Sequence, residues 1–187
     1  IVYLVESIDD AVGDTISNAA GSKTLQEAVN EAPDGVETTI SIQKHVKLGS
    51  TLSIPAGKSI KITCDEPYTV LATSGTRGDL VDIAEGATLE LAGNVALRGR
   101  YNTGSIVNSA GALVLSGSAT VFGGTASSTA SGAVKLSGPA ASLTMNGGVI
   151  EKCTVDEVYC GTVLATNGAH VALQGGSIRG NRVASAD

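Results

Sequence analysis

Short runs of alternating apolar and polar residues recur along most of this chain. Each run holds two apolar residues separated by one other residue, and a turn follows it. The second members of successive pairs are separated by 20, 29, 24, 30 and 28 residues. A repeat of this length, built from strands and turns, is typical of a solenoid in which successive coils stack. The six pairs are Ile40/Ile42, Ile60/Ile62, Leu89/Leu91, Leu113/Leu115, Leu143/Met145 and Val171/Leu173.

Two further strands fit into each repeat. After Ile40/Ile42, for example, the apolar pairs Val46/Leu48 and Leu52/Ile54 complete a unit whose order then recurs. Three strands per repeat, all running the same way, predict a parallel β-helix with a triangular cross-section and about six rungs. Parallel connections are almost always right-handed, so we expect a right-handed helix. Side chains alternate across a strand, so Lys61 and Glu90 are expected to point outward.

The segment before the strands predicts a short amphipathic helix over residues 24–32. Thr24 and Glu27 match the capping-box pattern, and the helix is followed by a Pro-Asp-Gly turn at residues 33–35. The apolar face of such a helix would cover the first open rung of the solenoid. This face consists of Leu25, Ala28, Val29 and Ala32.

These patterns divide the chain into two parts. Residues 1–38 are expected to form an N-terminal edge strand and the capping helix, and residues 39–187 the parallel β-helix. An open solenoid end exposes strand edges that proteins normally cover. We therefore expect the natural protein to continue beyond Asp187.

Glycine marks the corners of the predicted coils. Such positions suit backbone with positive φ, or places where two backbones approach closely. Two of these glycines precede an apolar pair by three residues and four follow one by two. They are Gly57, Gly86, Gly93, Gly117, Gly147 and Gly175.

Composition excludes several classes of partner. The 187 residues include 12 basic and 18 acidic ones, a net charge of −6, and no basic run that would neutralise several phosphates. We therefore predict no nucleic-acid binding. No apolar stretch is long enough to cross a bilayer, so we predict no membrane insertion either.

Two of the three cysteines lie close together. Cys153 and Cys160 flank a segment that we interpret as an excursion from the repeat. A loop that leaves and rejoins the stack would allow a disulfide between them. The alternative, two free thiols that pack as small apolar groups, is equally compatible with the sequence.

Two nine-residue strings, MNGGVIEKC (145–153) and LQGGSIRGN (173–181), align with a step of 28 residues. They resemble the Gly-Gly-x-Ile repeat of right-handed β-helix surface proteins of bacteria, within the broad pectate-lyase-like superfamily. Residues 24–62 resemble the opening segment of these proteins. The resemblance implies the fold, and it implies a secreted or cell-surface location. Cys153 departs from the repeat, where the family has the Asn that Asn181 retains, so this position would interrupt an Asn ladder.

Candidate catalytic residues do not form a column along the stack. Enzymes of this superfamily place several acidic residues on one outer face, beside a basic residue or a histidine. Here the outward acids are dispersed, and His45 and His170 lie in the first and last rungs. We therefore predict no catalytic residues, metal site or cofactor. The acids considered are Asp82, Glu90, Glu151, Asp156 and Glu157.

One tripeptide points to a class of partner. Arg77-Gly78-Asp79 lies in a predicted turn, where a guanidinium and a carboxylate on either side of a Gly bend would match the sites of integrins. The alternative is that Arg77 pairs with a nearby acid and Asp79 caps the turn.

The sequence as a whole favours a monomeric fragment of an extracellular bacterial surface protein, acting as an adhesin or a structural stalk. Its partners would be host cell-surface or matrix proteins, or glycans. The alternative is a fragment of a polysaccharide lyase or glycoside hydrolase of the same fold. A phage tailspike segment, which would form trimers, is a third possibility.

Overall fold

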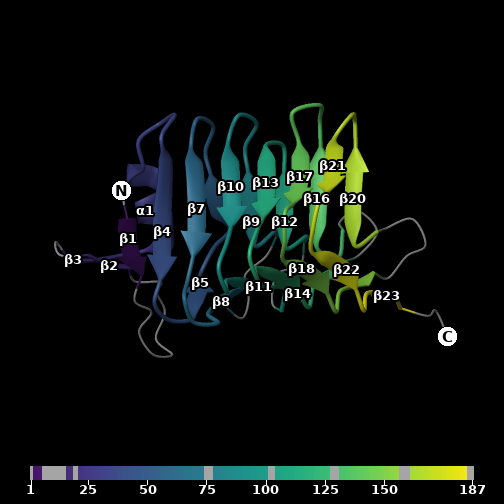
Figure 1. The fold of residues 1–187 in the computed structure, drawn as a ribbon, viewed down its shortest axis with the longest axis horizontal. Helices are drawn as coiled ribbons and strands as arrows, with labels where there is room; N and C mark the ends of the chain where they lie inside the picture. The colour runs from purple at the N-terminus through teal and green to yellow at the C-terminus, as the bar shows by residue number, and fades with distance from the viewer. Residues whose placement is uncertain are drawn as a thin grey trace.

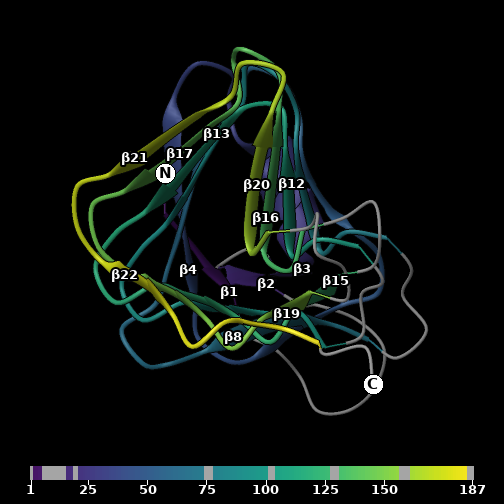
Figure 2. The same ribbon diagram turned by 90° about the vertical axis from the view of Figure 1, so that its right-hand side faces the viewer.

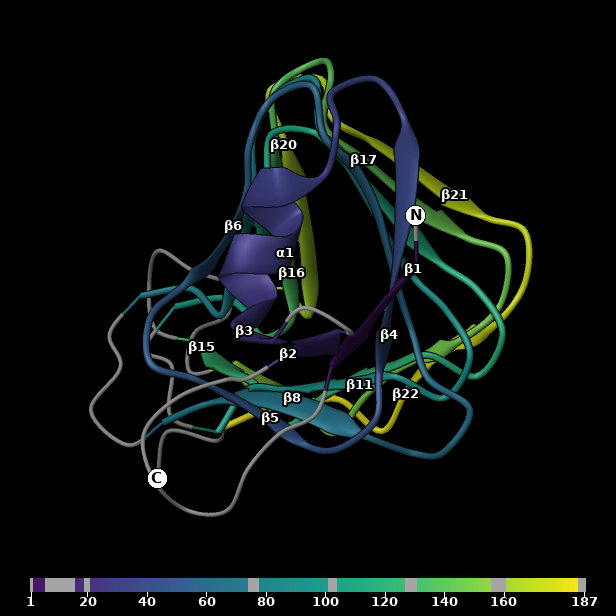
Figure 3. The ribbon, with the colours of Figure 1, turned by 90° about the vertical axis from the view of Figure 1, so that its left-hand side faces the viewer.

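The computed structural model describes residues 2–5, 16–18, 21–73, 78–100, 104–126, 131–155 and 161–184, and its strands form a parallel β-helix (Figure 1). Successive coils add strands to three sheets, which make the first, second and third faces of a triangular rod (Figure 2). Viewed from the N-terminal end, the chain turns clockwise as it recedes, so the solenoid is right-handed (Figure 3). The predicted fold class is confirmed.

The first face is a seven-stranded parallel sheet. Its outermost strand, β1, pairs with β4 and confirms the edge strand expected at the start of the chain. In spatial order its strands are β1 (Val2–Val5), β4 (Glu37–Ile42), β7 (Ser59–Thr63), β10 (Thr88–Leu91), β13 (Ala112–Leu115), β17 (Ser142–Met145) and β21 (His170–Leu173).

The second face has six strands and the third has five. The second face comprises β5 (Val46–Leu48), β8 (Thr69–Ala72), β11 (Ala96–Arg98), β14 (Thr120–Phe122), β18 (Val149–Glu151) and β22 (Ser177–Arg179). The third comprises β6 (Leu52–Ile54), β9 (Val81–Ile83), β12 (Val107–Ser109), β16 (Val134–Ser137) and β20 (Val163–Thr166).

The remaining strands form two smaller sheets. A three-stranded parallel sheet follows the second face in the later coils, and an antiparallel hairpin precedes the helix. The first consists of β15 (Thr125–Ala126), β19 (Thr154–Val155) and β23 (Arg182–Val183), and the hairpin of β2 (Ile16–Asn18) and β3 (Gly21–Lys23).

The described chain has fewer complete turns than the six rungs that the sequence predicts. In the last turn, residues 170–184 of the described chain, the first and second faces gain a strand each but the third gains none. Inward positions of this turn are exposed because no further strand covers them in the described residues. Leu173 is 61% exposed, whereas Met145, its partner in the preceding coil, is completely buried.

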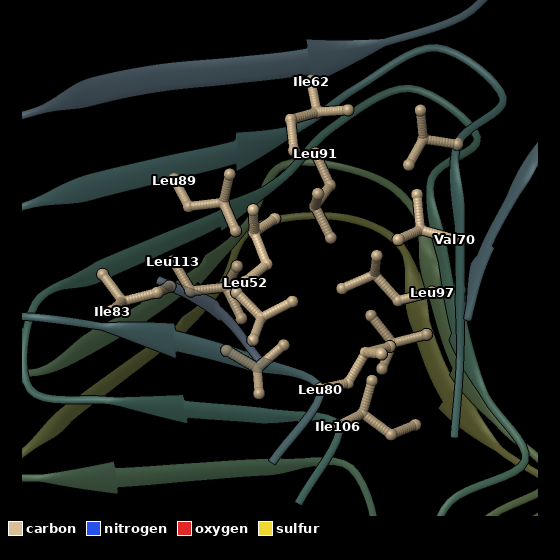
Figure 4. Close-up of a cluster of buried hydrophobic side chains, with 14 of the residues drawn as sticks. Leu52, Ile62, Val70, Leu80, Ile83, Leu89, Leu91, Leu97, Ile106 and Leu113 are labelled. Carbon is tan, nitrogen blue, oxygen red and sulfur yellow. The ribbon is translucent and has the colours of Figure 1, made fainter. Parts of the chain in front are cut away.

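A ladder of aliphatic side chains fills the interior. On the first face, Leu89 aligns with Ile60 and Leu113, and Leu91 aligns with Ile62 and Leu115, as the repeat predicts. All of these side chains are at most 1% exposed. Figure 4 shows Leu89, Leu91 and Leu113 together with side chains of the other two faces, such as Leu97 and Ile83. The single core therefore fixes all three faces at once.

The first rung differs from the predicted register by two residues. Ile40, not Ile42, lies beside Ile62, and Thr38 lies beside Ile60. A shift of two residues leaves every side chain on its original side of the sheet, so the core pattern is retained. Thr38 is completely buried, and its hydroxyl donates to the Val36 carbonyl at 3.4 Å.

The corner glycines meet the expected conditions. Gly57, Gly86, Gly93 and Gly117 have positive φ. At Gly147 an added Cβ would lie 2.8 Å from the Gly117 carbonyl oxygen, so the close approach of neighbouring coils requires glycine there.

The predicted helix, α1 (Leu25–Glu31), covers the N-terminal end of the stack (Figure 3). The Glu27 amide donates to Thr24 Oγ1 at 3.1 Å and the Thr24 amide to Glu27 Oε2 at 2.7 Å, which confirms the capping box. The side-chain amide of Gln26 bonds both backbone groups of Ser53, at 2.7 and 2.9 Å. This pairing satisfies the open edge of β6 where a strand would otherwise lie. No helix in the described part of the chain is long and apolar enough to cross a membrane.

Candidate functional site

The Arg77-Gly78-Asp79 turn is described only in part, because Arg77 lies outside the described residues. Gly78 is exposed with φ +92°, whereas Asp79 is half-buried. Asp79 Oδ1 accepts a 2.6 Å hydrogen bond from the Ser105 amide, and the Asp79 carbonyl accepts one of 2.7 Å from Thr51 Oγ1. Asp79 therefore joins three successive coils. Integrin recognition stays a prediction, and it would require this carboxylate to leave Ser105.

Burial raises the pKa of the Asp79 carboxyl, and its hydrogen bond from the Ser105 backbone opposes that rise. Next along the stack, the completely buried Ser105 accepts a 3.1 Å bond from the Ser131 amide, and the two hydroxyls lie 3.3 Å apart. Sequence reasoning missed this polar column, because small hydroxyl residues outside the alternating pairs carry no periodic signal.

Cys153 carries a completely buried thiol, and its Sγ donates to the Glu151 carbonyl at 3.4 Å. Burial raises the pKa of this thiol. Asn181 of the next coil bonds the Cys153 amide through Oδ1 at 2.9 Å and the Ile150 carbonyl through Nδ2 at 3.2 Å. Cys160 lies outside the described residues, so a disulfide between the two cysteines stays a prediction.

The two histidines lie in different coils, the first and the last, as the sequence indicated. His45 is exposed but not isolated: its Nδ1 accepts a 3.0 Å bond from the Thr69 amide, and its ring meets Tyr68 edge-on at 5.8 Å. His170 begins β21 at the other end of the rod and is also exposed.

The outward acids lie on different faces and have different partners. Asp82, on the third face, accepts a 2.9 Å bond from Asn108 Nδ2. Glu90, on the first face, lies 3.0 Å from Lys61 Nζ and accepts a 2.6 Å bond from Ser116 Oγ. Asp156 and Glu157 lie outside the described residues. Within the described ranges, no group of three or more His, Cys, Asp or Glu side chains is placed to hold a metal ion.

The second face carries the most varied outward side chains. One outward column runs along the rod through six aligned positions. The Arg98 guanidinium lies 5.7 Å from the centre of the Phe122 ring, a distance typical of a cation–π contact. The column consists of Lys47, Leu71, Arg98, Phe122, Glu151 and Arg179.

Glu151 is the ionic centre of this column. Its carboxylate lies 2.9 Å from Lys152 Nζ and accepts a 3.1 Å bond from Arg179 Nε. Hydrogen bonds from Lys152 and then from Arg179 lower the pKa of Glu151, so it is ionised at neutral pH. Two cations therefore converge on one acid at the surface.

Two adjacent hollows open on this side of the rod. The larger, of about 320 Å³, is lined by hydroxyl and amide side chains such as Thr120 and Asn94, together with Phe122, Glu151 and Lys152. The smaller, of about 210 Å³, is lined by Lys152, Thr154 and Arg182 among others. Lys152 lies between them, at a backbone φ of +55° that is unusual for a residue other than glycine.

Comparisons of the chain with known protein families, with curated proteins and with solved structures gave no match.

Proposed function

We propose that this chain is a segment of an extracellular bacterial surface protein whose β-helix serves as an adhesive stalk. The main support is the uninterrupted core. Inward side chains align from coil to coil along each face, so the stack forms a rod whose outward side chains vary without disturbing the fold. Such a scaffold suits display of a surface at a distance from its anchoring point.

The adhesive role has two candidate surfaces. The turn at Arg77-Gly78-Asp79 offers the tripeptide, and the second face offers the hollows around Phe122 and Lys152. An array of glycans and matrix proteins, probed with the purified chain with and without calcium, tests the role directly. A saturable signal on one ligand class supports adhesion, and an array without signal contradicts it.

Cell attachment tests the tripeptide by itself. Surfaces coated with the wild type, Arg77→Ala or Asp79→Glu are presented to cells that bear integrins. If the tripeptide mediates contact, both variants lose attachment. Equal attachment to all three surfaces would exclude it. Thermal melting of Asp79→Glu is measured beside this assay, because the variant also changes the bond to Ser105.

A polysaccharide lyase or glycoside hydrolase is the second candidate. One observation favours it: Asp79 has a raised pKa and interacts electrostatically with both Asp82 and Lys135, so acids and a base lie near one another beside the third face. Incubation with polygalacturonate and with neutral glucans, read as unsaturated uronate or new reducing ends, tests this alternative. Product formation that Asp79→Asn and Lys135→Ala abolish would replace the adhesive proposal.

A further inference from the structure

Cations gather on one side of this acidic protein. We define the second-face segments as residues 43–48, 65–73, 93–100, 117–126, 147–155 and 175–184. They contain seven Lys or Arg and three Asp or Glu, whereas the other described residues contain four and eight. The charge of the described chain is therefore unevenly distributed: the second-face segments are basic, although the protein as a whole is acidic. The seven cations are Lys44, Lys47, Arg98, Arg100, Lys152, Arg179 and Arg182.

The strand register spaces several of these cations along the axis. Lys47 and Arg98 are two strands apart in the outward column, and Arg98 and Arg179 are three strands apart. With about 4.8 Å between strands, these intervals are about 10 and 14 Å. A linear polyanion lying along the rod would meet positive charge at intervals, without any bending of the protein.

Neutral hydrogen-bonding groups line part of the larger hollow, beside Phe122, Glu151 and Lys152. Thr69, Ser118 and Thr120 contribute hydroxyls and Asn94 an amide. Asn94 Nδ2 also donates to the Asp65 carbonyl, which fixes the amide in place. In the smaller hollow Arg182 Nε donates to Thr154 Oγ1 at 3.2 Å. This arrangement leaves the other guanidinium nitrogens of Arg182 and the exposed Lys152 available for an anionic group.

We propose that the second-face segments bind an acidic glycan, a polysaccharide whose sugar rings carry carboxylate or sulfate groups. The anionic groups contact Lys152, Arg182 and Arg98, and the ring hydroxyls contact the hydroxyl and amide groups of the larger hollow. This inference rests on the proposed adhesive function and names its ligand class. No bond of the glycan is broken in this role.

Glu151 favours a glycan over a nucleic acid. A carboxylate in the middle of the column accepts hydrogen bonds from sugar hydroxyls, but it repels a continuous phosphate backbone. A glycan that alternates anionic groups with hydroxyls matches both the cations and Glu151.

Binding of the whole chain to immobilised heparin, hyaluronan, neutral dextran and duplex DNA tests the proposal. We compare the wild type with Lys152→Ala/Arg182→Ala. A matched control, Lys61→Ala/Lys135→Ala, removes the same charge from the first and third faces. The second-face variant should weaken acidic-glycan binding about tenfold at low salt, and the control should stay within about twofold. Binding to heparin but not to hyaluronan would identify sulfate as the recognised group. Binding to both would show that carboxylate groups are sufficient.

Several outcomes would overturn the proposal. They are absence of binding to both acidic glycans, equal losses in the two double variants, or binding of dextran or DNA as tight as that of the glycans. Thermal melting of both double variants establishes that each is folded. If matrix proteins bind on the array while acidic glycans do not, this inference fails and the adhesive function stands. If neither binds, both fail.

Discussion

The first and second faces of the rod share one core but present different surfaces. Before the last turn, inward positions on both are mostly aliphatic and buried, as Leu89 and Leu97 illustrate. Outward positions on the first face are mostly small, with the Lys61–Glu90 pair at 3.0 Å, whereas the second face gathers cations around Phe122 and two hollows. Inward residues therefore specify this fold, whereas outward residues can differ from face to face without changing it.

The largest expected effect comes from removing core volume on either face. Leu89→Ala and Leu97→Ala should each lower the free energy of unfolding by about 2–5 kcal/mol, because both side chains are completely buried in the same core. Chemical denaturation followed by circular dichroism measures this change. The outward control Thr120→Ala should change stability by less than about 1 kcal/mol. A large loss at only one of the two leucines would show that the faces do not share a core.

The corner between the faces provides the next test. Gly147→Ala places a Cβ 2.8 Å from the Gly117 carbonyl oxygen and 3.0 Å from its nitrogen, so neighbouring coils must separate. We expect a loss of about 1–3 kcal/mol in the free energy of unfolding. Gly49→Ala is the matched control, because an added Cβ there meets nothing within 4 Å. Equal melting temperatures of the two variants would contradict the close approach of the coils.

The pH dependence of stability should differ in sign between Asp79, which is half-buried in its turn, and Glu151 on the second face. Burial raises the pKa of Asp79 above 3.8, so its stabilising contribution is full below the unfolded pKa and is lost as pH rises through the folded pKa. The wild type should therefore lose stability relative to Asp79→Asn as pH rises toward neutrality. Lys152 and Arg179 lower the pKa of Glu151 below 4.5, so the contribution of Glu151 is present above that value and is lost as pH falls through the folded pKa.

The Glu151→Gln variant should accordingly show the opposite slope to Asp79→Asn when each is compared with the wild type. Denaturation midpoints across the acidic range measure both differences. The Glu151 effect should be the smaller of the two, because solvent screens exposed ion pairs. Slopes of the same sign would contradict the contrast between the two environments.

The smallest expected effect is a change in the salt dependence of binding to the second face. Affinity for heparin should fall as salt rises, because binding releases counterions from the polyanion and this release is less favourable at higher salt concentration. The slope should be shallower in Lys152→Ala/Arg182→Ala than in the wild type, and unchanged in Lys61→Ala/Lys135→Ala. Affinity measured at several salt concentrations gives these slopes. Identical slopes in all three proteins would show that Lys152 and Arg182 on the second face do not contact the polyanion.

Much of the fold was predictable, because a core built from repeated coils requires apolar residues at regular positions in the sequence. The spacing of Leu89, Leu113 and Leu143 reproduces the strand register, and the pattern at Thr24 and Glu27 locates the helix cap. The predicted register of the first rung was wrong by two residues, because a shift of two keeps the same residues facing inward. The two registers differ in whether Thr38 lies beside Ile60, and the sequence gives no sign that Thr38 is buried.

The site was much less predictable than the fold. Arg98 and Arg179 are 81 positions apart in the sequence, yet the coils place them in one column. Outward residues obey no period that a single chain reveals, and their alignment depends on the length of every intervening turn. The partners of Asp79 were hidden for the same reason, since Ser105 lies in the next coil.

The adhesive role of the second face is tested on the array of glycans and matrix proteins, with the wild type run beside Lys152→Ala/Arg182→Ala in the presence and absence of calcium. We predict a saturable signal on acidic glycans that the double variant loses and that does not require calcium, because the described contacts use protein cations alone. An array without signal for either protein would contradict an adhesive role for this rod. A signal that the double variant retains in full would move recognition away from the second face.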